Sequence, residues 1–145
     1  MSPAGIFFAK TKSSAMKKIA KIVLFGIAMW ASIFIGAMFI FTLRDSDRLF
    51  FETLIGLILV LFVTLYSIFY FKKINEHFVR NGVQIGIGWM LVNLAVDIPM
   101  FSFGPMSRPL WDYFKDIGFA YFSIPVITIG MGYLLDHKST GATEK

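Results

Sequence analysis

Four long apolar runs constrain this chain more than any other feature of its sequence. The first run is free of charged residues from Ile22 to Leu43, and three runs of comparable length follow it. A helix needs about 20 consecutive apolar residues to cross the hydrocarbon core of a bilayer. Within that core each crossing segment satisfies its own backbone hydrogen bonds, which favours α-helices. The sequence therefore predicts an all-α integral membrane protein, a four-helix transmembrane bundle with short loops.

The predicted organisation is one membrane domain between two polar ends. Residues 1–18 form a basic N-terminal segment, residues 19–135 form the membrane domain, and residues 136–145 form a polar tail. The four predicted spans are residues 20–43, 49–71, 82–103 and 117–135. Composition agrees with this division, because only 16% of the residues are charged, against roughly 25% in soluble domains.

Two connecting segments are predicted to be helical. The segment Lys72–Arg80 is expected to prolong the second span beyond the membrane and to end at Asn81 and Gly82, which tolerate the left-handed conformation. The aromatic segment Pro109–Asp116 is expected to form a short interfacial helix with proline at its first position. Both predictions concern the bundle's ends and leave the four spans unchanged.

Small residues recur at helical spacing in two of the predicted spans. Ala28, Ser32 and Gly36 are four residues apart in the first span, and Gly82 and Gly86 are four apart in the third. Small residues at this spacing allow a neighbouring helix to approach closely. We therefore expect both edges to pack against other helices.

Basic residues are distributed unevenly between the two sides of the predicted bundle. All lysines and arginines lie in the N-terminal part, the second loop or the tail, except Arg44, Arg48, Arg108 and Lys115. The positive-inside rule then places both termini in the cytoplasm. The net charge of +5 is thus attributed to topology, and no nucleic acid is predicted as a partner. The expected partners are the lipid bilayer and a second membrane protein, either another copy of the chain or a different subunit.

Several chemical classes lack support in the sequence. The chain contains no cysteine, which excludes thiol catalysis, disulfides and cysteine metal sites. We find no glycine-rich nucleotide motif, no cluster of metal ligands and no nucleophile beside a base. The sequence accordingly predicts no catalytic residue, no metal and no cofactor, and an enzyme ranks third among the functions considered.

One carboxylate lies inside the third predicted span. Asp97 follows Asn93 by four residues and Trp89 by eight, so the three side chains share one helical face. A carboxylate at the centre of a membrane helix costs roughly 2.5–3.5 kcal/mol on insertion scales and is normally kept only with a partner or a task. Asp97 and its face are therefore the candidate site.

The depth of Asp97 restricts which side chains it can reach. It lies about 9 Å inside the end of the predicted span at Phe103, taking 1.5 Å per residue. Aspartate is too short to reach the interface from there, so it needs a protein or water partner, or a proton. Asn93 is expected to donate to it from the same helix, and Tyr121 and Ser123 are expected to donate from the fourth span.

Two interpretations of this site compete. In the first, Asp97, Asn93, Trp89, Tyr121 and Ser123 bind an ion, a proton or a substrate in a small transport or ion-binding protein, or in its accessory subunit. In the second, Asp97 and Asn93 form a polar clamp between helices of a non-catalytic structural or interaction protein.

Overall fold

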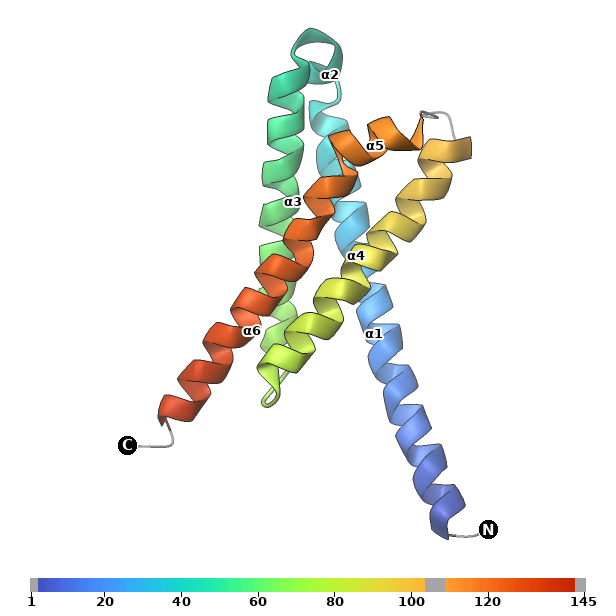
Figure 1. Ribbon diagram of the computed structural model, residues 1–145, viewed down its shortest axis with the longest axis vertical. Helices are drawn as coiled ribbons and strands as arrows, with labels where there is room; N and C mark the ends of the chain where they lie inside the picture. Colours follow the sequence, from blue (N-terminus) through green and yellow to red (C-terminus); the bar gives the residue numbers. More distant parts are fainter. Residues whose placement is uncertain (1–2, 104–108, 143–145) are drawn as a thin grey trace.

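The computed structural model describes residues 3–103 and 109–142, with side chains from residue 14 to residue 138 apart from 104–108 and 116. All regular structure within these ranges is helical (Figure 1). The elements are α1 (Pro3–Ile40), α2 (Leu43–Ser46), α3 (Arg48–Phe71), α4 (Phe78–Phe103), α5 (Leu110–Asp116), the 3-10 helix η1 (Gly118–Phe122) and α6 (Ser123–Ala142). Both polar ends of the chain extend the neighbouring span helices, since α1 begins at Pro3 and α6 runs to Ala142.

Four helical segments are long and apolar enough to cross a membrane, which confirms this part of the prediction. They are Ser14–Ile40, Arg48–Phe71, Phe78–Phe103 and Gly118–Lys138. In Figure 1 the start of α1, the turn between α3 and α4, and the end of α6 lie at the lower end of the bundle. The short helices α2 and α5 lie at the upper end. The segments therefore alternate in direction, and their even number places the start of α1 and the end of α6 at the same end of the bundle.

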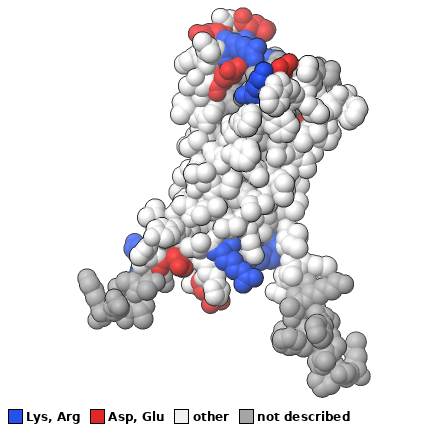
Figure 2. Space-filling view, viewed as in Figure 1, with Lys and Arg blue, Asp and Glu red and all other residues white. Residues whose placement is uncertain are grey.

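The surface between the two ends is apolar. Figure 2 shows the charged side chains gathered at the upper and lower ends, with an uncharged belt between them. Large hydrophobic side chains on this belt are exposed, among them Leu24, Leu57 and Val126. A continuous exposed apolar surface of this kind is typical of membrane contact. The core is formed mainly by larger side chains, including Met29, Tyr70, Ile85, Trp89 and Ile124.

The segment after the second span differs from the prediction. The helix α3 ends at Phe71, and a tight turn replaces the expected extension through Arg80. His77 in this turn has a positive φ of 54°. The buried Asn81 then donates from Nδ2 to the carbonyl oxygens of Glu76 and His77, at 3.1 and 3.0 Å. Asn81 therefore closes the turn that precedes it, whereas the sequence suggested that it ends a helix.

Ser32 and Gly36 on the predicted small-residue edge of α1 pack against α3, whereas Ala28, the third residue of that edge, is exposed. The Ser32 hydroxyl lies 2.9 Å from the Tyr66 hydroxyl. A Cβ atom added at Gly36 would lie 3.0 Å from Cγ2 of Ile58. Both contacts require a short side chain on α1, because a longer one would separate the helices.

The predicted glycine edge of α4 packs even more closely, against α6. A Cβ atom on Gly82 would lie 2.5 Å from the carbonyl oxygen of Thr128, and one on Gly86 would lie 2.7 Å from Cα of Pro125. The α6 helix contributes Gly132, where a Cβ atom would lie 2.6 Å from the carbonyl oxygen of Phe78. Glycine on both helices thus brings the two backbones into contact.

The orientation of the bundle remains a prediction with a direct test. Reporter fusions at Lys73 and at the C-terminus are expected to score as cytoplasmic, because most basic residues lie at the lower end. Fusions at Ser46, between α1 and α3, are expected to score as external. The opposite pattern at all three positions would invert the bundle, and a mixed pattern would contradict the four-span arrangement.

Candidate functional site: a buried aspartate with three donors

Asp97 is buried within the bundle and accepts hydrogen bonds from three separate elements. Its side chain is 3% exposed. Trp30 on α1 donates from Nε1 to Oδ1 at 2.6 Å. Tyr113 on α5 and Tyr121 on η1 donate from their hydroxyls to Oδ2, at 3.1 and 2.5 Å. The carboxylate on α4 is therefore the common acceptor for groups distant from one another in the sequence.

The predicted face of α4 is the buried face. Trp89 and Asn93 have no exposed surface and lie on the same side of the helix as Asp97. Among the described residues, Arg48 forms an ion pair with Glu52, and none is seen with Asp97. Among these residues, hydrogen-bond donors therefore surround the Asp97 carboxylate.

The structure confirms one of the expected donors to Asp97 and corrects two. Tyr121 does donate to Asp97. Asn93 instead donates from Nδ2 to the Trp89 carbonyl oxygen at 2.8 Å, and Ser123 donates to the Ala120 carbonyl oxygen at 2.7 Å. Side chains on a helix lean toward its N-terminus, so Asn93 reaches back along α4 and away from Asp97. Ser123 bonds locally because it opens α6, where a hydroxyl readily reaches a preceding carbonyl.

Trp89 packs between helices and makes no hydrogen bond to Asp97 among the described residues. Its Nε1 donates to the carbonyl oxygen of Ile22 on α1, at 3.1 Å. Its ring stacks on Phe25 and meets Tyr70 edge-on, with centroids 6.4 and 5.9 Å apart. Trp89 therefore joins α4 to α1 and α3 on the N-terminal side of Asp97.

Sequence reasoning missed two of the three donors. Trp30 lies deep in the first span, where an indole N–H needs a partner, and this requirement was an available signal. Tyr113 was expected at the outer interface with Trp111. The structure leaves Trp111 64% exposed but buries Tyr113 to 1%. The α5 helix folds back across the upper end of the bundle, as Figure 1 shows, and from it the Tyr113 hydroxyl donates to Asp97.

Asp97 also lines a cavity at the upper end of the bundle. The cavity has a volume of about 120 Å³. Its wall is mostly apolar and aromatic, and the polar groups on it include Arg44, Arg48, Glu52, Asp97 and Tyr121. The Arg48 Nε lies 2.8 Å from the Glu52 carboxylate, and the Arg44 guanidinium lies 5.4 Å from the Phe41 ring centre. The cavity thus connects the charged upper end with the buried carboxylate.

The surroundings of Tyr113 keep it in its donor form. Burial, reinforced by the charge of Asp97 and by their hydrogen bond, raises the pKa of the Tyr113 hydroxyl well above its usual value. The hydroxyl therefore carries its proton throughout the physiological pH range. It remains available to donate to Asp97, or to accept from it after a rotation of the O–H bond.

The chemistry open to this site is proton binding or hydrogen bonding at one carboxylate. An ionised carboxylate offers about four acceptor positions, and three donors already use this one. Among the residues that the structure describes, no three His, Cys, Asp or Glu side chains gather as metal ligands.

Comparison with protein-family models, curated proteins and solved structures finds no match to this chain.

Proposed function

We propose that this chain is a small multi-pass membrane protein that binds a proton at Asp97, within a transport or ion-binding activity or as an accessory subunit of one. One observation carries the proposal. Asp97 lines a cavity that extends to the charged upper end, and it is held by donors from three other elements. Intramembrane carboxylates in such surroundings commonly mark proton or ion pathways.

The donor set favours a proton over a metal cation as the ligand. Trp30, Tyr113 and Tyr121 direct N–H and O–H groups at the carboxylate, and a cation would meet these hydrogens at close range. A proton is accommodated more simply, because either tyrosine hydroxyl can rotate and accept from a neutral Asp97. The indole of Trp30 can only donate, so it would keep Oδ1 as the acceptor.

Protonation at this position would alter contacts between helices. The partners of Asp97 lie on α1, α5 and η1, and each hydrogen bond to an ionised carboxylate is stronger than one to a neutral acid. A gain or loss of one proton therefore changes how firmly α4 is held to three other elements. This is the coupling that a proton-linked transport step requires.

The second candidate is a non-catalytic membrane protein in which Asp97 is a clamp. The three hydrogen bonds that join α4 to α1, α5 and η1 favour it directly. The residues that form this clamp differ from the predicted pair of Asp97 and Asn93, because Asn93 donates its hydrogen bond within its own helix. Trp30, Tyr113 and Tyr121 take the place of Asn93 in this clamp.

The substitution Asp97→Asn separates the two candidates, since asparagine keeps the size and an acceptor oxygen but cannot ionise. We expect the free energy of unfolding to change by about 1 kcal/mol or less, because intramembrane hydrogen bonds average only about 0.6 kcal/mol. Proton flux in liposomes and the pH dependence of thermal stability in detergent are both expected to be lost. The other titratable or charged groups around the site, namely Arg44, Arg48, Glu52, Tyr113 and Tyr121, stay unchanged.

The matched control is Asp112→Asn, which removes an exposed carboxylate at the same end of the bundle. It is expected to leave flux and the pH profile as in the wild type. Identical flux and pH profiles for wild type and Asp97→Asn would contradict proton binding as the function and favour the clamp.

A further inference from the structure

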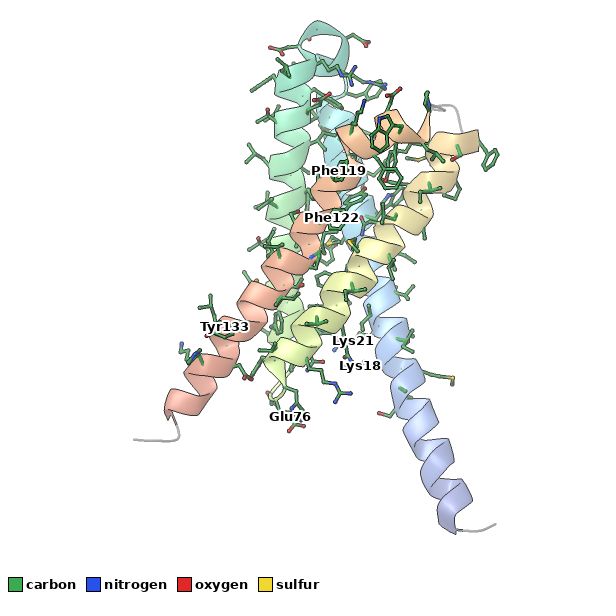
Figure 3. The ribbon with its side chains drawn as sticks, viewed as in Figure 1. Lys18, Lys21, Glu76, Phe119, Phe122 and Tyr133 are labelled. Atoms are coloured by element: carbon green, nitrogen blue, oxygen red, sulfur yellow. The ribbon has the colours of Figure 1, made fainter. Side chains whose placement is uncertain are left out.

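Cationic side chains from three elements gather at the lower end of the bundle. They are Lys18 and Lys21 on α1, Lys72 and Lys73 in the turn after α3, and Arg80 on α4, and we call them the basic cluster. Figure 2 shows basic side chains at the centre of this end. In Figure 3 the labelled Lys18 and Lys21 lie between α1 and the first turns of α4. The cluster is independent of Asp97, which lies toward the other end.

Two lysines of the basic cluster lie over two aromatic rings that contact each other. The Lys21 ammonium lies 4.9 Å from the ring centre of Tyr70 on α3. The Lys73 ammonium, after α3, lies 5.9 Å from the ring centre of Phe25 on α1. These two rings contact each other edge-on at 5.7 Å. Each helix thus places its lysine over the other helix's ring, which orders both cations while leaving their N–H donors open.

Two of the remaining cations, Lys18 and Arg80, bring like charges together. Lys18 lies close enough to Arg80 for the two charges to act on each other. Glu76, exposed on the same turn, makes no ion pair with the basic cluster within the part of the chain that the structure describes. The turn itself is fixed by the two hydrogen bonds from Asn81. Like charges held together in this way favour an anionic ligand that bridges them.

The surface beside the cluster indicates the source of that anion. Lys72 lies 5.9 Å from the ring centre of Phe69, and Phe69 is itself 56% exposed on the apolar belt. Leu24 on α1, just inside Lys21, is 66% exposed. A ligand at the cluster would therefore meet cations on one side and open apolar surface on the other. A phospholipid has this pairing of phosphate and acyl chains, and free phosphate lacks it.

We infer that the basic cluster binds the headgroup of an anionic phospholipid, whose chains lie along the apolar surfaces of α1 and α3. Lysine and arginine donate charge-assisted hydrogen bonds to phosphate oxygens. Basic pockets between membrane helices recognise anionic headgroups on the cytoplasmic side, where the positive-inside rule puts this end. The bound lipid would neutralise the mutual repulsion of Lys18 and Arg80 and hold α1, α3 and α4 together.

The test is a thermal-stability titration of the purified full chain in a nonionic detergent. Short-chain phosphatidylglycerol is expected to raise the melting temperature, whereas equal concentrations of phosphatidylcholine or inorganic phosphate are expected to leave it unchanged. The double variant Lys21→Gln/Lys73→Gln is expected to weaken the apparent affinity for phosphatidylglycerol about 30-fold, since each lysine contributes about fivefold. High salt is expected to weaken it as well.

Two further variants keep this test decisive. Lys18→Gln/Arg80→Gln removes two exposed cations without a ring contact, so it reports on binding even where the first pair affects folding. Lys115→Gln removes a lysine held over Trp111 at the opposite end and is expected to bind phosphatidylglycerol as the wild type does. An equal response to phosphatidylcholine or to inorganic phosphate would overturn the proposal. Unchanged affinity in both cluster variants, or an equal loss in Lys115→Gln, would do the same.

Discussion

Replacing Asp97 with leucine is expected to destabilise the bundle by about 2–4 kcal/mol. Leucine removes the acceptor and leaves the N–H of Trp30 and the O–H groups of Tyr113 and Tyr121 without a partner. Three intramembrane hydrogen bonds at about 0.6 kcal/mol each set the lower figure, and a cost slightly above about 1 kcal/mol for each of the three unpaired buried groups sets the upper one. Reversible unfolding in mixed detergent micelles measures the difference.

The matched control for this substitution is Asn93→Leu, one helical turn away on the same buried face. Asn93 loses a single bond within its own helix, and its Oδ1 is already without a partner. We expect a change of about 1 kcal/mol or less, in either direction. If both leucine variants proved equally stable, the three hydrogen bonds would contribute nothing to the fold, and the clamp would lose its support.

The second large effect is expected at the contact between α4 and α6, where Gly82→Ala should cost about 1–3 kcal/mol. The added methyl group would lie 2.5 Å from the carbonyl oxygen of Thr128 and 3.3 Å from Cα of Ile129. Both are backbone atoms, so relief requires the helices to separate, and no side-chain rotation can provide it. The melting temperature in detergent, followed by circular dichroism, reports the loss.

The control is Gly130→Ala on α6, where an added Cβ atom meets no atom within 4 Å. That variant is expected to be as stable as the wild type or slightly more stable, because alanine favours helix over glycine. Gly132→Ala should reproduce the loss from the other helix, since its Cβ would lie 2.6 Å from the Phe78 carbonyl oxygen. Equal melting temperatures for Gly82→Ala and Gly130→Ala would contradict the close backbone contact.

Much of the architecture could be predicted because it depends on local patterns. The four apolar runs correspond to the four long helical segments, since helix length follows from how many consecutive residues avoid charge. The edges at Gly36 and Gly82 pack as expected, because absence of a side chain is what permits close approach. The turn at residues 72–77 escaped prediction. The spacing of Glu76 and Arg80 favoured helix there by only a few tenths of a kcal/mol. In the structure Asn81 instead donates to the carbonyl oxygens of Glu76 and His77 and closes a turn.

The sequence by itself determined that Asp97 would need partners, because a buried carboxylate without them is too costly to retain. It also indicated Tyr121 and Ser123 on the fourth span as donors, and of these Tyr121 donates to Asp97 whereas Ser123 bonds locally. Only the tertiary structure decided which other groups supply the donors. Trp30 meets Asp97 through the rotation of α1 about its axis, and Tyr113 meets it because α5 folds back over the end of the bundle. Helix rotation and fold-back depend on the packing of the whole bundle, and no local pattern in the sequence encodes that packing.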